Sequence, residues 1–583
     1  MSKKDKFDFT QEWQDKIAGE NYNITLDYYA RADLNWNMYN GFHWVGINSG
    51  ELPKFTMNIY RTSTEYIIAS IMSKPVTAEY TADNIPKPMD NDASPEAEEK
   101  RKARQMIGLL NKAAKLKWEK EKLDHKLRQG CLLDAACSGD MCAHVYWDMS
   151  VDTRQDEKGD FKTEIIDGAN VMFGNPNTAE TNSQPYILVI GRDLVSKLRK
   201  EAEAHKGETK NTKEDIARIT SDKETDYQLG EGHTELEGND CVSGKATYVI
   251  KYWRDEETGN IHYNKSTKAC CIRKNVDLGI KRYPIVWGNW QIRKNCYHGI
   301  PIGNGLIDNQ ISINQGFAMV FYYLKTHAFG KVIIDGTRIQ NWSNKIGEVI
   351  RADGSVSDIV KQLEGGSFNT AFITMLDKAI QQTKEFNGAN DAALGQINPE
   401  RASGSAIMLT AKQAAIPHAN IEANLHQFIE DLYLVWGEFY LNKYQNRELY
   451  FMGDDGIESG EYDASLLKDV LLSCKINVGQ SSLWSEATEL QNLTALRGTG
   501  DITALEMLER LPANTVKDVQ GLISNAKLKE MLAQEAQNVT NQMAQAVKGL
   551  GGNAPGVPGQ APQKGQQNPS FVQRKPQPIQ MPK

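Results

Sequence analysis

The stretch that decides the fold is residues 302–324, which read IGNGLIDNQISINQGFAMVFYYL. Its length and its density of apolar residues predict one long helix. A short polar segment with β-like composition follows at about residues 329–366, and a second helix is predicted at about residues 369–387. Together these elements predict a stalk. The first helix leads outward, the short segment reverses the chain, and the second helix returns.

Two further features follow the stalk. Residues 401–406 read RASGSA and predict a loop. Pro417 is expected to kink or break the helix that comes next. The apolar residues of this helix fall at spacings of three and four, which predicts an amphipathic helix with one buried face. They are Leu425, Phe428, Ile429, Leu432, Val435, Trp436, Phe439 and Tyr440.

The bulk numbers describe an ordinary soluble protein with more than one domain. A chain of 583 residues can bury several cores, and 40% hydrophobic with 24% charged residues is typical of globular proteins. We find no run of about eighteen apolar residues, so a membrane span is not expected. The charged start MSKKDK is not a secretory signal, and eight scattered cysteines favour a reducing compartment.

The net charge of −8 limits the ways in which this chain can bind nucleic acid. Proteins that grip duplex DNA through its phosphates usually present a basic face, because counterion release supplies most of that affinity. We therefore expect any contact with DNA to be loose.

The remaining sequence predicts a mixed α and β protein. Aromatic residues from Tyr22 to Tyr39 repeat with a helical rhythm that ends at Asn40-Gly41, and residues 95–129 predict a charged, solvated helix. Helices are expected again over about residues 484–548, and the Gly-, Pro- and Gln-rich residues from 549 predict a disordered tail. Strands are predicted at residues 142–148, 164–167, 171–173, 246–253, 261–263 and 285–290.

No pattern of catalytic or metal-binding residues stands out. A phosphate-binding loop needs Ser or Thr after its Gly-Lys, and Gly244-Lys245 is followed by Ala246. Cys131, Cys137, Cys142 and His144 lack the short paired spacing of structural zinc sites. We therefore expect no enzyme activity, no catalytic residues, no metal and no cofactor.

Three groups of residues, taken in order, resemble tailed-bacteriophage portal proteins, the head-to-tail connectors, in their podovirus-like form. The first is residues 36–44, WNMYNGFHW, with Leu52-Pro53 and Asn58-Ile59 behind it. The second is Gly139-Asp140 before residues 145–148, with NVMFGNP at residues 170–176. The third is the helix start at 303–314 with the loop ASGSA at 402–406.

This resemblance implies an α+β portal fold with a mixed α/β wing, a helical stem hairpin, a small β-containing clip and a helical crown. The implied parts are the wing at residues 1–299, stem helix 1 at 300–328, the clip at 329–368, stem helix 2 at 369–395, the tunnel loop at 396–410, a wing return at 411–480, the crown at 481–548 and a disordered tail at 549–583.

The resemblance also implies a function. About twelve copies would form a ring at one capsid vertex, through which double-stranded DNA is packaged and later ejected. Implied partners are the major capsid protein, a scaffold, the terminase large subunit and then the adaptor and tail proteins, with no membrane. The protein would be assembled in the host cytoplasm and reside in the virion. The alternative is another virion structural protein, a head–tail adaptor or an internal head protein.

Site residues follow from the same resemblance. The tunnel loop would place Arg401, Ser403, Gly404 and Ser405 near passing DNA, although Ser403 and Gly404 equally suit a helix-start turn. Lys331, Lys345 and Lys361 would face the channel or the partners of the clip. Subunits would pack through stem residues, or the same residues would pack within one subunit. They are Ile311, Phe317, Val320, Phe372, Leu376 and Ile380.

Overall fold

The computed structural model of the chain describes residues 10–72, 76–85, 94–153, 155, 158–222, 244–327, 331–335, 337, 360–363, 370–386, 418–453, 456–468, 470–478, 493–499, 502–510, 521 and 523. The chain divides into two compact units, one of residues 1–484 and one of residues 485–583. In the second unit the structure describes α16 (Ala504–Glu509), which begins with a capping box between Thr503 and Glu506.

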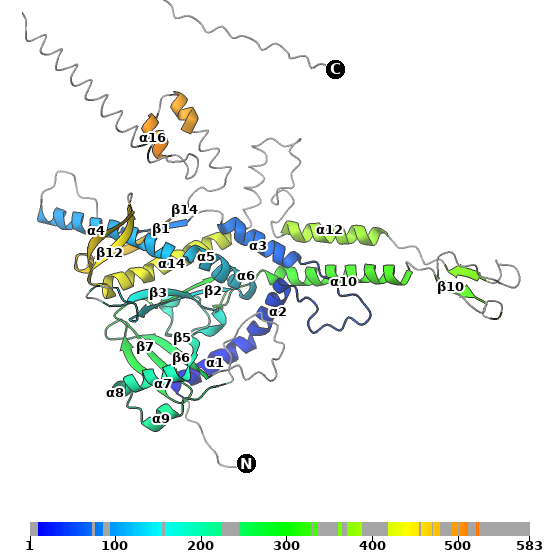
Figure 1. Cartoon of the computed structure of the whole chain (residues 1–583), viewed down its shortest axis with the longest axis horizontal. Helices are drawn as coiled ribbons and strands as arrows, with labels where there is room; N and C mark the ends of the chain where they lie inside the picture. Colours follow the sequence, from blue (N-terminus) through cyan, green and yellow to red (C-terminus); the bar gives the residue numbers. More distant parts are fainter. Residues whose placement is uncertain are drawn as a thin grey trace, which may run out of the picture. The chain divides into compact units, whose positions relative to one another are not determined.

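The first unit combines helices with antiparallel strands (Figure 1). Its helices are α1 (Gln11–Thr25), α2 (Tyr28–Asn40), α3 (Ile59–Met72), α4 (Pro95–Lys120), α5 (Leu123–Lys126), a π-helix at Leu127–Leu132, α6 (Leu133–Ser138), α7 (Val195–Ala204), α8 (Lys206–Thr209), α9 (Lys213–Ala217), α10 (Gly303–His327), α12 (Thr370–Phe386) and α14 (Ala419–Lys443). Short 3-10 turns lie at Gly168–Asn170, Thr181–Ser183 and Ala464–Leu467.

The strands of this unit form two larger sheets and three pairs. The larger sheets have the orders β4-β5-β6-β7-β8 and β3-β2-β9, and the pairs are β1–β14, β10–β11 and β12–β13. The strands are β1 (Val76–Ala82), β2 (Asp140–Asp148), β3 (Asp160–Ile165), β4 (Val171–Phe173), β5 (Tyr186–Leu194), β6 (Lys245–Arg254), β7 (Ile261–Thr267), β8 (Cys271–Asp277), β9 (Ile285–Asn289), β10 (Lys331–Ile334), β11 (Val360–Leu363), β12 (Asn446–Gly453), β13 (Gly456–Asp463) and β14 (Leu472–Val478). The mixed α and β class predicted from the sequence is confirmed.

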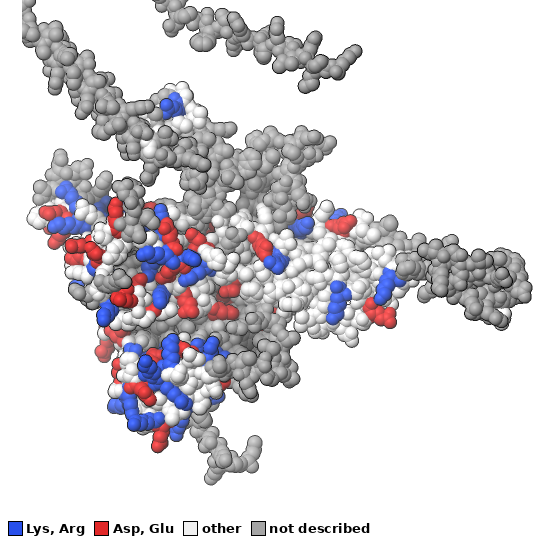
Figure 2. Space-filling model, viewed as in Figure 1, with Lys and Arg blue, Asp and Glu red and all other residues white. Residues whose placement is uncertain are grey.

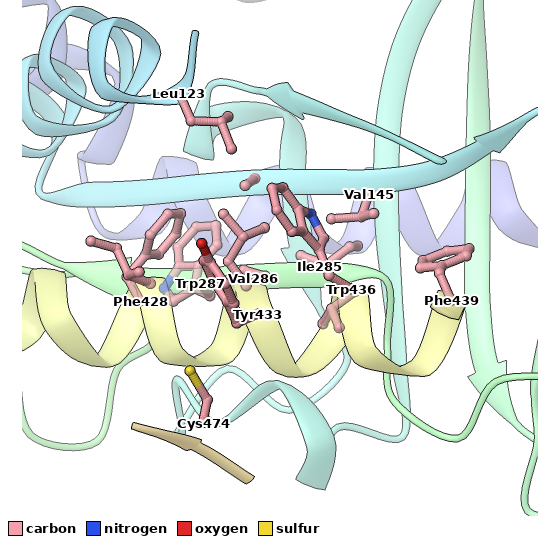
Figure 3. Close-up of a cluster of buried hydrophobic side chains, with 14 of the residues drawn as sticks. Leu123, Val145, Ile285, Val286, Trp287, Phe428, Tyr433, Trp436, Phe439 and Cys474 are labelled. Carbon is pink, nitrogen blue, oxygen red and sulfur yellow. The ribbon is translucent and has the colours of Figure 1, made fainter. Parts of the chain in front are cut away.

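The main core forms where α14 packs against the sheet of β2 and β9 (Figure 3). All eight apolar residues that predicted a buried face on α14 are buried. Trp436 fits because its indole N–H donates to Thr163 Oγ1 at 2.9 Å, which satisfies the one polar atom of the ring. Helix α14 begins at Ala419, and Pro417, which was expected to kink or break this helix, lies outside the described residues.

The two larger sheets are joined by a buried hydrogen bond. His144 Nε2 of β2 lies 2.9 Å from the hydroxyl of Tyr252 of β6. Burial lowers the pKa of His144 to about 4, because the interior disfavours the charged imidazolium. The ring is therefore neutral at neutral pH.

Two segments that were predicted as single helices are broken. The aromatic rhythm of Tyr22 to Tyr39 spans α1 and α2, which are separated at Asp27, whose φ is 53°. The charged helix ends near Lys122, also at φ 53°, and α5 follows. One residue in the left-handed region interrupts a helix, but the apolar residues on either side keep a helical spacing in the sequence. That spacing therefore did not reveal either break.

Candidate functional site

Helices α10 and α12 lie side by side and form the most distinctive feature of the first unit (Figure 1). The chain leaves along α10, pairs β10 with β11 and returns along α12. We call the pair of α10 and α12 the shaft. At 1.5 Å per residue, α10 is long enough to span about 35 Å.

The two helices of the shaft approach closely at a glycine. A Cβ atom on Gly316 of α10 would lie 2.5 Å from Leu376 Cδ2 of α12. Leu376 is only 8% exposed, because its side chain fills the space that Gly316 leaves. Gly316 therefore sets the distance between the helices.

Gln310 fastens the shaft to α3. Its Oε1 accepts hydrogen bonds from the backbone N–H groups of Ile59 at 2.9 Å and Tyr60 at 3.1 Å. These amides are in the first turn of α3, where no carbonyl of the helix itself can receive them. Gln310 Nε2 donates to Met57 O at 2.6 Å and to Asn314 Oδ1 at 3.0 Å. A buried side chain of α10 thus caps another helix.

Asn314 extends this contact to the loop after α2. Its Nδ2 lies 2.7 Å from His43 Nδ1, and His43 Nε2 lies 2.8 Å from Met38 O. The amide N–H donates, so Nδ1 is the acceptor and Nε2 carries the proton. Burial lowers the pKa of His43, in agreement with a neutral ring.

The first residue of α10 is in close contact with α2. A Cβ atom on Gly303 would overlap Asn35 Oδ1, whose own amide donates to Cys137 O at 2.7 Å. Gly303 is therefore required for packing. The nearby Gly305 has open space around it.

A buried carboxylate holds the loop that leads into the shaft. Asp140 Oδ1 accepts from Asn289 Nδ2 and from Gly299 N, each at 2.8 Å, and Oδ2 lies 2.6 Å from His298 Nδ1. The Gly139 backbone has φ +100°, and a Cβ there would lie 2.7 Å from Gly299 O. Strand β2, strand β9 and the loop before α10 meet at this point.

A loop of residues 41–58 supports one side of α10. The ring of Phe55 contacts the rings of Phe317 and Phe321, with centroids 5.1 Å apart in each case. Farther along, the Tyr322 hydroxyl donates to Glu51 Oε2 at 3.0 Å. This side of the shaft is thus partly covered by the protein's own chain.

The other side of the shaft is an open groove between α10 and α12, with a volume of about 420 Å³. None of its lining residues is charged, and α10 has no charged residue between Asp308 and Lys325. Figure 2 shows mostly uncharged residues over the shaft. The groove is lined by Asn309, Ser312, Ile313, Gln315, Gly316, Met319, Phe372, Met375, Leu376, Ala379, Gln382 and Thr383.

This geometry was compared with known proteins. A protein-family model described as phage P22-like portal protein matches residues 158–458, more than half of the chain. The chain belongs to this portal protein family. The match includes the shaft, the sheet of β4 to β8 and α14. A search of the curated proteins finds no match.

The portal protein places the predicted stem residues in several environments. Ile311 packs inside the subunit, beside the buried cluster of Met38 and Leu306, and Phe317 contacts Phe55. Phe372 and Leu376 line the groove. Val320 and Ile380 are half-buried.

The predicted clip and loop residues are only partly described. In the ladder of β10 and β11, Lys331 is opposite Leu363 and Lys361 is opposite Ile333. Lys345 and the predicted tunnel-loop residues Arg401, Ser403, Gly404 and Ser405 lie outside the described residues. The assignment of these residues to a clip and a tunnel loop stays a prediction.

Sequence reasoning missed the residues that anchor the shaft, namely Gln310, Asn314 and His43. The signal was present, because Gln310 and Asn314 are four positions apart among apolar residues and therefore share one helix face. A polar pair on an apolar face indicates buried hydrogen bonds, but the sequence does not name their partners.

Neither a metal site nor a membrane-spanning helix is found among the described residues. No group of three or more His, Cys, Asp or Glu residues there is placed to hold a metal ion. Among the helices that the structure describes, none has the length and apolar character needed to cross a bilayer.

Proposed function

We propose that this protein forms the portal ring at one vertex of a phage capsid, through which double-stranded DNA is packaged and ejected. The observation that carries the proposal is a long two-helix shaft with an uncharged groove, in a chain of the P22-like portal family. A shaft held at its base by Gln310 and Gly303 is a rigid element that neighbouring copies can pack against.

The charge distribution suits a conduit. The chain has a net charge of −8, and α10 carries no lysine or arginine before Lys325. Strong phosphate contacts would hold DNA in place, because each one adds binding free energy that must be lost again for DNA to move. A weakly binding lining lets DNA pass.

The parts of the chain are proposed as follows. The shaft is the stem and the β10–β11 pair belongs to the clip, while residues 1–299 and 411–480 form the wing. Residues 396–410 form the tunnel loop, residues 481–548 the crown and residues 549–583 a tail. The ring, of about twelve copies, docks the terminase during packaging and the adaptor and tail proteins afterwards.

Microscopy and native mass spectrometry of the purified full-length chain test the proposed function. We expect closed rings with a central hole in negative stain and one dominant high-mass species. Protomers alone, at every concentration and salt tried, would show that the chain does not form a portal by itself.

The lysines of the proposed clip are tested separately. Lys331→Glu with Lys345→Glu is expected to lower DNA packaging while rings still assemble, because a changed charge disturbs docking of the partner more than subunit packing. The matched control is Lys378→Glu, an exposed position on α12. Loss of the ring in the double variant would contradict a partner-docking role.

A further inference from the structure

The shaft has two apolar sides that point in opposite directions. On α10, Met319 is 52% exposed and Phe321 is 44% exposed; on α12, Ile373 is 41% exposed and Met375 is 70% exposed. Residues two positions apart on a helix differ by about 200° in direction. Each helix therefore presents an apolar residue to either side of the shaft.

One of these sides is a groove and the other is a ridge. Met319 and Met375 line the uncharged groove. Phe321 lies on the other side, where Phe55 packs against it, and with Leu324, which is 49% exposed, it forms what we call the ridge. Burying these exposed apolar side chains removes their surface from water, which stabilises an interface.

We infer that the groove of one copy receives the ridge of the next copy, so that Phe321 and Leu324 pack against Met319 and Met375 of the neighbouring shaft. This inference rests on the proposed ring and names the surfaces that would close it. A contact between two different surfaces of identical chains is head-to-tail, and repeated rotation by the same angle closes such contacts into a ring.

The chemistry of the groove favours a second copy over other occupants. DNA is a poor partner, because none of the groove's lining residues is charged and phosphates need cations. Methionine side chains are flexible and polarisable, and they make favourable contacts with aromatic rings such as that of Phe321. The side of α12 turned away from the groove differs, since its exposed residues include Asp377 and Gln381 beside Ile373 and suit solvent.

A charge placed in the groove tests the inference. Met375→Lys is expected to weaken ring assembly at least tenfold, because a lysine ammonium would have to be buried without a partner. The protomer should fold normally, since Met375 is 70% exposed. Gln381→Lys is the matched control, because Gln381 is exposed on the part of α12 that faces away from α10, and its rings should assemble like wild type.

Cross-linking tests the pairing itself. In the Met375→Cys with Leu324→Cys variant, a short bismaleimide should join neighbouring copies into covalent multimers. The Gln381→Cys with Leu324→Cys variant, whose first cysteine faces away from α10, and the three single variants, which control for the native cysteines, should give none.

The outcomes separate the two proposals. Rings that assemble equally well with Met375→Lys, or that give no cross-link in the paired-cysteine variant, overturn the groove-and-ridge contact and leave the portal function standing. Wild-type chains that never form rings overturn both.

Discussion

Single glycines decide how closely the shaft meets its surroundings. Gly303 and Gly305 both lie in the first turn of α10, but only Gly303 faces another chain segment, at Asn35. In the sequence the two glycines look alike, since both stand at the start of the predicted helix. The difference between them depends on α2, which is far away in the sequence, and no local pattern reports it.

The pair Gly303→Ala and Gly305→Ala measures this difference. Gly303→Ala is expected to destabilise the protein by about 1–3 kcal/mol, because the methyl group overlaps Asn35. Gly305→Ala should be neutral or stabilise by up to about 1 kcal/mol, since alanine is the better helix former and has room. Urea unfolding of both variants checks the prediction, and equal effects would contradict the close contact at Gly303.

His144 makes the stability depend on pH. The pKa of His144 is about 4 in the folded protein and ordinarily 6.5. As the pH falls, this histidine is therefore protonated in the unfolded chain before it is protonated in the folded protein. The stability from this group is intact above pH 6.5, falls as the pH drops towards 4 and then levels off. Between pH 7 and pH 5 the loss is about 2 kcal/mol.

The variant His144→Gln isolates that loss, because an amide can still bond the Tyr252 hydroxyl but does not titrate. We expect wild type to lose about 2 kcal/mol more than this variant when urea unfolding is repeated at pH 7 and pH 5. Parallel losses in the two proteins would show that His144 is not the group responsible.

Among the elements, the long helices were the easiest to predict. The helices predicted at residues 302–324 and about 369–387 are α10 and α12, and the apolar residues spaced three and four apart lie on α14, because a buried helix face needs a repeat near 3.6. The strand predicted at residues 164–167 is β3 at Asp160–Ile165 instead. Its position is set by pairing with β2 in the antiparallel ladder, and a short run of apolar residues does not reveal that register.

The contact between α10 and α3 is tested with Gln310→Met. This substitution keeps the length of the side chain but leaves the amide of Tyr60 without its acceptor and that of Ile59 with Met57 O alone, at 3.0 Å. We expect a loss of about 2–4 kcal/mol in the free energy of unfolding. The exposed Gln381→Met should stay within about 0.5 kcal/mol of wild type. If Gln310→Met lowered the free energy of unfolding by as little as Gln381→Met, water would be accepting the hydrogen bonds that Gln310 accepts in the wild type.

At the scale of the whole molecule, the family and the mixed fold were predictable, and the surfaces were not. The order of several weak motifs pointed to a portal protein, and the family match agrees. Amphipathic patterns show which residues avoid water, but they do not distinguish a contact within the subunit from one between copies. Ile311 was predicted to pack either between subunits or within one, and in the structure it lies half-buried beside Met38 and Leu306 of its own subunit.

The net charge of −8 leads to a prediction for the assembled protein. Binding of a short DNA duplex should be weaker than about 1 μM at physiological salt and should weaken further as salt rises. Fluorescence anisotropy with a labelled duplex measures both. Nanomolar binding at physiological salt would require either a basic surface, if it weakens steeply with salt, or contacts to the bases, if it resists salt, and either would argue against a freely sliding conduit.

The cap that Gln310 places on α3 has a mechanical consequence. A pull or push along the shaft reaches α3 at its amino-terminal end, through hydrogen bonds made by one side chain. Helices resist axial load well, whereas loops absorb it. A load on the shaft is therefore passed to the N-terminal helices at the amides of Ile59 and Tyr60, beside residue 310.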